Sequence, residues 1–141
     1  MLFWEPPAVA LCFAGSLTVL EIVLTRRRAR AKAKREAGAK FRLAFLAEAM
    51  AHLDNKDVYR LIHQAQAKHD AAIAEFRPFV DPKRIKHFDA AEHELRRCRN
   101  ELQPRILMIL AAIDSGKPVD NSDRVRLKEA LNELLAFADM P

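Results

Sequence analysis

Hydrophobic residues form one continuous stretch near the amino terminus and recur at helical spacing along the rest of the chain. The stretch from Pro6 to Thr25 reads PPAVALCFAGSLTVLEIVLT, with Glu21 as its one charged residue. A helix of this length rises about 30 Å, which is the thickness of a bilayer's hydrocarbon core. Glu21 is placed one turn from the end of the stretch, where a carboxylate can reach the polar interface. The pattern therefore predicts a transmembrane anchor within residues 1–25.

Basic residues follow this stretch directly. Residues 26–35 read RRRARAKAKR, whereas Glu5 is the one charged side chain ahead of the span. The positive-inside rule then places the amino terminus outside and the rest of the chain in the cytoplasm. The residues expected to contact anionic lipid headgroups are Arg26, Arg27, Arg28, Arg30, Lys32, Lys34 and Arg35.

The net charge of +5 is confined to this juxtamembrane segment. Residues 26–42 hold nine Lys and Arg against Glu36, whereas residues 43–141 hold fifteen Lys and Arg against sixteen Asp and Glu. Headgroup binding accounts for such a segment at about 1 kcal/mol for each basic residue near the surface. The run lacks the interleaved aromatic residues on which bases stack, so the sequence does not favour a nucleic-acid partner.

The pattern after the anchor is helical throughout. A helical linker covers residues 26–40, and Gly38 is expected to break it. Apolar residues then recur at a spacing of three and four, and Asp81 with Pro82 resembles an N-cap and a first helical position. The predicted helices cover residues 39–53, 56–77, 82–102, 105–113 and 123–138. The helix at 105–113 is expected to be buried on most sides, and the last helix is expected to bury Val125. The predicted fold is all-α, with an N-terminal transmembrane helix followed by a small cytoplasmic helical bundle over residues 41–141.

Two carboxylate and histidine pairs are candidates for chemistry. Glu48 with His52, and Asp89 with His93, are spaced four residues apart and would each share one helix face. Such a pair could serve as metal ligands or as an acid and base, and equally as solvated charge pairs. A di-metal bundle needs Glu-x-x-His, which does not occur in the sequence. His69 lies on an apolar stripe, where a packed histidine and a functional one are both possible.

Other catalytic signatures are absent from the sequence. The fragment SGKP at residues 115–118 has Pro118 where a phosphate loop needs Ser or Thr. Cys98 lies between two arginines but also on an apolar helix face, where a cysteine is usually a small core residue. The sequence therefore predicts neither an enzyme nor a bound cofactor or metal.

The order of these segments resembles a family of small uncharacterised bacterial single-pass membrane proteins, some of them carried in prophage-like regions. The matching segments are FRLAFLAEAMAHL, DVYRLIHQAQAKHDAAIAEFRPFV with HDAAIAEFR as its clearest part, a short Pro-opened helix with Phe88 and Asp89, and the closing ELLAFA. The family carries aromatic residues after the Phe-Asp pair, where this chain reads HELRRC. The resemblance implies a bacterial inner (plasma) membrane protein with a cytoplasmic domain, and it implies no established activity.

The leading hypothesis is a membrane-tethered scaffolding or binding module that holds an unknown protein partner or a second copy of itself. A small-residue row of Ala10, Ala14 and Thr18 would let two membrane helices approach closely. One alternative is an enzyme or metal protein that uses the histidine and carboxylate pairs. Another is a phage lysis component of the spanin kind, which requires the helical domain outside the cytoplasm.

Overall fold

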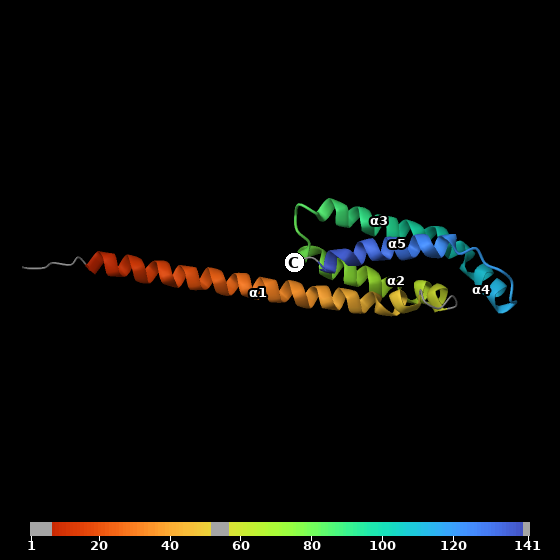
Figure 1. Cartoon of the computed structure of the whole chain (residues 1–141), viewed down its shortest axis with the longest axis horizontal. Coiled ribbons are helices and arrows are strands. Elements are labelled where there is room, and N and C mark those ends of the chain that lie inside the picture. The colour runs from red at the N-terminus through yellow and green to blue at the C-terminus, as the bar shows by residue number, and fades with distance from the viewer. Residues whose placement is uncertain (1–6, 52–56, 140–141) are drawn as a thin grey trace, which may run out of the picture. The chain divides into compact units, whose positions relative to one another are not determined.

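A computed structural model describes residues 7–51 and 57–139; within them, the side chains of residues 7–14, 16, 48–51, 57, 58 and 63 lie outside the description. The described chain is all-α, as the sequence predicts, and these ranges contain no strand. Five α-helices make up most of it (Figure 1): α1 (Pro7–Ala51), α2 (Asp57–Phe76), α3 (Ile85–Leu102), α4 (Ile106–Asp114) and α5 (Ser122–Ala136). Short 3-10 helices follow three of them: η1 (Arg77–Phe79), η2 (Gln103–Arg105) and η3 (Phe137–Asp139).

Helix α1 passes through the position where a break was expected. The chain divides into two compact units, residues 1–35 and residues 36–141, and α1 contributes to both. The predicted break at Gly38 is wrong, because Gly38 lies inside α1 and is buried. A Cβ atom at Gly38 would lie 3.2 Å from the carbonyl oxygen of Ala138. Glycine therefore serves a close approach between α1 and the end of the chain, and not a helix end.

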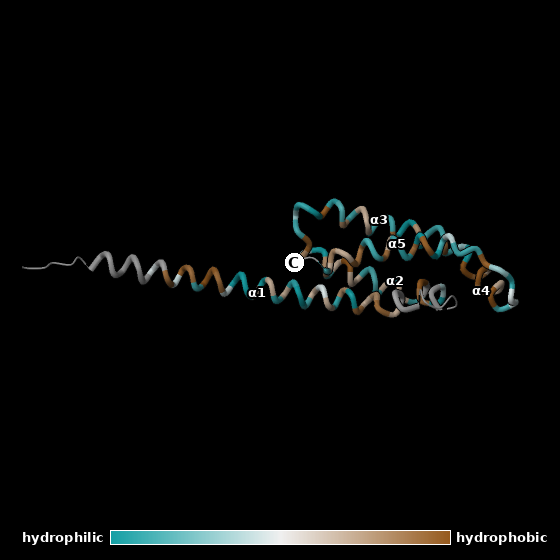
Figure 2. Tube along the Cα trace, in the orientation of Figure 1, coloured by the Kyte–Doolittle hydropathy of each residue, from teal (hydrophilic) through white to brown (hydrophobic). Residues whose placement is uncertain are grey.

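The described part of the first unit is helical, and its residues 17–24 expose apolar side chains in several directions around the helix. Leu17, Val19, Leu20, Ile22, Val23 and Leu24 are each at least 40% exposed. Figure 2 shows this hydrophobic stretch directly before the hydrophilic one. In the part of the chain that the structure describes, no helix is both long and apolar enough to cross a bilayer. Residues 6–14 of the predicted span, including Ala10 and Ala14, lie outside the described side chains.

The second unit is an antiparallel bundle of the last part of α1 with α2, α3 and α5 (Figure 1). Aromatic rings hold the first three together, since Phe41 of α1 stacks on Phe76 of α2 with ring centroids 4.6 Å apart, and Phe76 lies 6.0 Å from Phe88 of α3. Leucines continue the core along α3 and α5. The fully buried ones are Leu95, Leu127, Leu131 and Leu134. The apolar stripes predicted from helical spacing thus form one core.

Helix α4 is less buried than its composition predicts. Ile106 and Ile109 face the core, whereas Leu107 is 79% exposed and Met108 is 69% exposed. The expectation of burial on most sides is therefore wrong. The helix lies at one end of the bundle, where one face at most can contact the other helices (Figure 1). Val125 of α5, also expected in the core, is half exposed.

Local hydrogen bonds explain where two helices begin and end. The backbone N–H of Lys83 donates to the Asp81 carboxylate over 2.9 Å, and the N–H of Arg84 donates to the Asp81 carbonyl over 2.8 Å. These bonds make a separate turn, so α3 starts at Ile85 and not at Pro82 as predicted. At the end of α4, Gly116 has a φ of 69°, and the N–H groups of residues 116 and 117 bond back to Ile113 and Ala112. This Schellman cap uses the amides that a phosphate loop would need.

Candidate functional site

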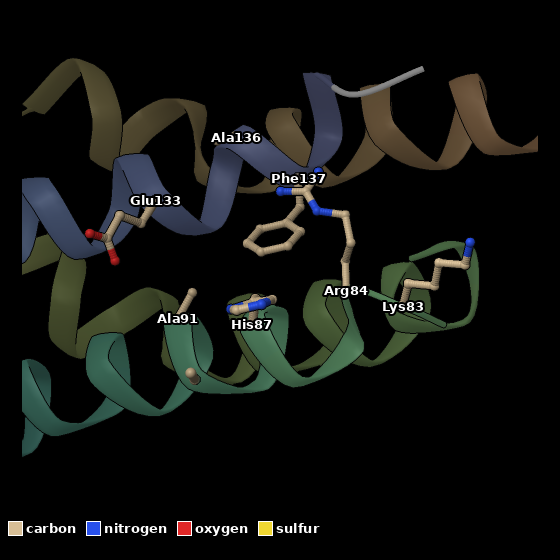
Figure 3. A pocket seen from close by; sticks show the side chains of 8 residues that line it. Lys83, Arg84, His87, Ala91, Glu133, Ala136 and Phe137 are labelled. Atoms are coloured by element: carbon tan, nitrogen blue, oxygen red, sulfur yellow. The ribbon is translucent and has the colours of Figure 1, made fainter. Parts of the chain in front are cut away.

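A surface pocket of about 670 Å³ lies between the start of α3 and the end of α5, and we call it the basic pocket. Its lysine and arginine come from the turn before α3, its histidine comes from the first turn of α3, and its apolar wall comes from both helices and η3 (Figure 3). The lining residues are Lys83, Arg84, His87, Ala90, Ala91, Glu133, Ala136 and Phe137. The pocket is within the range of volumes that hold small ligands or short peptide segments.

The aromatic ring of Phe137 organises this pocket. Its edge packs against Phe88, with centroids 5.3 Å apart and ring planes at 86°. The guanidinium carbon of Arg84 lies 5.0 Å from the centroid of the same ring, within the range of a cation–π contact. Because Phe88 is fully buried, the ring of Phe137 is anchored to the core and holds the arginine over the pocket.

The basic side chains of the pocket differ from most other arginines of the bundle in having no carboxylate partner among the described residues. Six arginines elsewhere lie 2.7 to 3.3 Å from a carboxylate oxygen: Arg42 with Asp139, Arg77 with Asp89, Arg96 with Asp70, Arg97 with Glu94, Arg105 with Asp123 and Arg126 with Glu101. Among the described residues, no such ion pair involves Lys83, Arg84 or His87. The pocket therefore presents positive charge that the bundle itself does not neutralise.

The placement of this charge runs against the usual electrostatics of a helix. The first turn of α3 contains no acidic residue, and Arg84 occupies the N-cap without a side-chain capping bond. Backbone N–H groups at a helix start already carry partial positive charge, which acidic side chains normally balance. The local sequence DPKRIKH places four basic residues around this start against the single carboxylate of Asp81, which already accepts the N–H of Lys83. An anionic group bound in the pocket would relieve this repulsion.

A buried polar pair, His69 of α2 and Arg99 of α3, lies inside the bundle. Arg99 Nη2 donates to His69 Nδ1 over 2.6 Å, and the imidazole stacks on Phe45 with centroids 4.2 Å apart. Burial lowers the pKa of His69 to about 4, with a further contribution from the Arg99 charge, while a hydrogen bond to the backbone of Ala44 opposes the shift. The histidine is therefore neutral at pH 7. Both side chains are almost fully inaccessible, so the pair is placed to hold helices together and not to meet a substrate.

Cys98 is buried on the core face of α3, as its position on the apolar stripe predicts. Its Sγ donates to Glu94 Oε1 over 3.6 Å. Burial raises the pKa of the thiol, and the Glu94 carboxylate raises it further. The flanking arginines do not offset this, because Arg97 bonds to Glu94 and Arg99 bonds to His69. The thiol is therefore protonated and inert at pH 7.

The predicted histidine and carboxylate pairs gain no support as a site. Asp89 accepts two bonds from Arg77, at 3.0 and 2.9 Å, and this guanidinium holds the pKa of the carboxyl below its usual range. Among the described residues, Asp89 has no hydrogen bond or ion pair with His93, which is exposed. The side chains of Glu48 and His52 lie outside the described residues. No group of three metal-binding side chains occurs in the described part of the chain.

The predicted membrane-surface residues lie in the middle of α1. Arg26, Arg27, Arg28, Arg30, Lys32 and Arg35 are exposed, and Lys34 is half-buried. Thr18, the described member of the small-residue row, is also exposed and donates its hydroxyl to the carbonyl of Gly15 over 2.9 Å. Thr25 does the same to Glu21 over 2.8 Å.

Sequence reasoning did not identify the basic pocket. Its cationic part and its aromatic wall are about fifty residues apart in the chain, and only the folded bundle brings them together. One local signal was available, namely the cluster of basic residues at a helix start where acidic residues are usual. Comparison of the chain with family models, curated proteins and solved structures finds no match.

Proposed function

We propose that this protein is a non-catalytic binding module tethered to the inner (plasma) membrane of a bacterium. In this proposal the amino terminus faces out, and the helical bundle lies in the cytoplasm and holds a protein partner. The observation that carries the proposal is the change of character along α1, from apolar residues exposed on every face to a basic run and then to a packed amphipathic segment.

The exposed apolar residues support a lipid environment. A helix in water normally buries one apolar stripe and exposes polar residues elsewhere. Residues 17–24 instead expose Val19, Leu20, Ile22 and Val23, which point in different directions around the helix. At about 25 cal/mol for each Å² of apolar surface, leaving such a segment in water is costly. The sequence extends the apolar stretch back to Pro6.

The polar groups within this stretch support the same environment. The hydroxyls of Thr18 and Thr25 bond to carbonyls three and four residues earlier in α1. Such bonds satisfy a hydroxyl without water, which a helix in a hydrocarbon medium requires. Glu21 remains near the basic end, where the carboxylate can extend to the interface.

The basic run supports the proposed orientation. Its seven predicted headgroup contacts lie directly after the apolar stretch, where anionic lipids of the cytoplasmic leaflet would attract them. The bundle itself is close to neutral, so the sequence offers no comparable attraction of the whole domain to nucleic acid.

Membrane fractionation tests the tether. We expect the full chain, expressed in a bacterium, to stay with membranes through washes with high salt and with alkaline carbonate, and to be released by detergent. Deleting residues 1–25 should move the protein to the soluble fraction with its helical circular dichroism retained. Release of the full chain by carbonate alone would mean that the apolar stretch only packs against another protein.

A topology reporter tests the orientation. A reporter that is active only in the periplasm, fused after Pro141, should be inactive in the parent chain. Replacing the arginines and lysines of residues 26–35 by Gln should restore activity to part of the population. The matched control replaces exposed lysines of the bundle, Lys117 and Lys128, and should leave the reporter inactive. Full activity in the parent chain would contradict the proposal and favour a spanin-like placement of the bundle.

A further inference from the structure

We infer that the basic pocket binds an acidic peptide segment of a partner protein, with a carboxylate side chain seated at Lys83 and Arg84 and an apolar side chain against Phe137. This inference rests on the proposed function, because it gives the binding module its docking site and names the chemistry of what docks there.

The charges along the pocket define the ligand's polarity. Figure 3 shows Lys83 and Arg84 at one end and Glu133 at the other, with His87 between them. None of the three basic residues has an ion-pair partner among the described residues, so a carboxylate entering this end displaces no existing bond. An amide or cationic side chain further along the bound segment would face Glu133. The site therefore suits a segment in which acidic residues are followed by a hydrogen-bond donor.

The apolar wall gives the segment a second contact. Phe137 and three alanines line the pocket between its two charged ends. The Phe137 ring is held by Phe88 and already carries the Arg84 guanidinium, so both groups are positioned before a ligand arrives. Pre-positioned groups lose less conformational entropy on binding than free side chains do. An aromatic or aliphatic side chain beside the acidic residue would cover the exposed part of this wall.

Glu133 and the weak net charge of the bundle argue against a polyanion. A nucleic acid or a polyphosphate would bring several negative charges into a pocket that ends in a carboxylate. Residues 43–141 carry fifteen basic and sixteen acidic side chains, so no extended positive surface surrounds the pocket to track a phosphate backbone. A segment with one or two acidic residues matches both the volume and the charge of the site.

Nuclear magnetic resonance on the full chain in zwitterionic detergent micelles tests this inference. The probe is a capped peptide of sequence Glu-Glu-Phe-Lys, and the reference peptide replaces both Glu residues by Gln. We expect the first peptide to shift the backbone amides of residues 83–91 and 133–137, with a Kd of about 1 mM or tighter. The reference peptide should bind at least about threefold more weakly, because it lacks the carboxylates.

Single substitutions separate the pocket from the rest of the surface. Arg84→Gln and Lys83→Gln should each weaken binding at least about threefold. Lys83 is exposed, so its replacement tests the site even where loss of the Arg84 contact with Phe137 disturbs the fold. The matched control is Arg77→Gln, which removes an exposed arginine that bonds to Asp89 outside the pocket and should leave binding unchanged. Glu133→Gln should weaken binding of the lysine-containing peptide.

Four outcomes would overturn the inference. The first is the absence of amide shifts at about 5 mM peptide, and the second is unchanged peptide binding in both Arg84→Gln and Lys83→Gln. The third is that inorganic phosphate at the same concentration causes equal amide shifts. The fourth is that vesicles of anionic lipid shift these amides whereas the peptide does not. Failure of peptide binding in a chain that stays in the membrane fraction would overturn this inference and leave the tether standing. Peptide binding by a chain that carbonate releases from the membrane would overturn the tether and leave this inference standing.

Discussion

The two parts of α1 differ in environment while sharing one helix. Residues 17–35 expose nearly all their side chains, the apolar ones included, whereas residues 36–47 bury Gly38, Phe41 and Phe45 along one face. The first part consists of one apolar block followed by one basic block, and the second part is amphipathic with helical spacing. Helix formation and burial are therefore separate properties, because Ala, Leu, Lys and Arg favour the helix both in the exposed part and in the packed part. What covers the helix depends on how its apolar residues are spaced.

The largest expected effect comes from replacing equivalent leucines in the two units. Leu131 of α5 is 0% exposed, whereas Leu20 of α1 is 55% exposed. Leu131→Ala should lower the free energy of unfolding of the bundle by about 3 kcal/mol, because it leaves a cavity in the core. Leu20→Ala should change it by less than about 0.5 kcal/mol. Urea unfolding of both variants in detergent, followed by circular dichroism, makes the comparison; equal losses would mean that residues 17–24 pack as core.

The pH dependence of stability tests the packed part through His69, which stacks on Phe45 of α1. The pKa of His69 is about 4 in the folded bundle against 6.5 unfolded. Between these values the unfolded chain takes up a proton that the folded chain does not. The contribution of His69 is therefore complete above pH 6.5 and falls by about 3 kcal/mol as the pH drops to 4.

Unfolding by urea at pH 7 and at pH 4.5 measures this loss. His69→Gln keeps a hydrogen-bond acceptor toward Arg99 but cannot titrate, so its stability should vary less with pH than that of the parent chain. The control is His93→Gln, which removes an exposed histidine and should keep the parent dependence. If the free energy of unfolding changed equally with pH in the parent chain and in His69→Gln, His69 would be protonated within the fold.

A graded series at Gly38 tests the contact that sets off the second part of α1 from the first. Gly38→Leu should lower the free energy of unfolding by about 1 to 3 kcal/mol, because its side chain must displace the carbonyl of Ala138. Gly38→Ala should be nearly neutral, since the gain in helix propensity of about 1 kcal/mol offsets the close contact at 3.2 Å. Gly15→Leu is the matched control, because a Cβ there meets nothing within 4 Å. A loss at Gly15 as large as at Gly38 would contradict this account.

The smallest expected effect is a gain, at Tyr59 of α2. Its side chain is buried, and its hydroxyl has no hydrogen-bond partner among the residues that the structure describes. Burial accordingly raises the pKa of the phenol. Tyr59→Phe removes a buried polar group without leaving a large cavity and should raise the free energy of unfolding by about 1 kcal/mol. Tyr59→Leu is the control for ring packing and should be destabilising. A loss of stability in Tyr59→Phe would show that the hydroxyl is bonded in solution.

Much of the bundle follows from its sequence pattern alone. Apolar residues three and four apart predict α2 and α5 to within two residues at each end, and they place Cys98 and His69 on the core face. The failures share one cause. The helix break at Gly38, the helix start at Pro82 and the burial of Leu107 are predictions from local propensity or composition. The actual conformation and burial of these residues depend on residues far away in the chain or on a turn that precedes the helix.

The sequence by itself therefore determined the all-α class, the helices and most of the core, because helical periodicity is a local property of each short segment of the chain. Tertiary structure decided which charges are neutralised by partners outside the same helix turn. Arg77 lies twelve residues from Asp89 and is paired, whereas Arg84 is five residues from the same aspartate and instead lies over Phe137, fifty-three residues away. Pairing depends on which side chains the packed helices bring within bonding distance, and sequence separation does not report that distance.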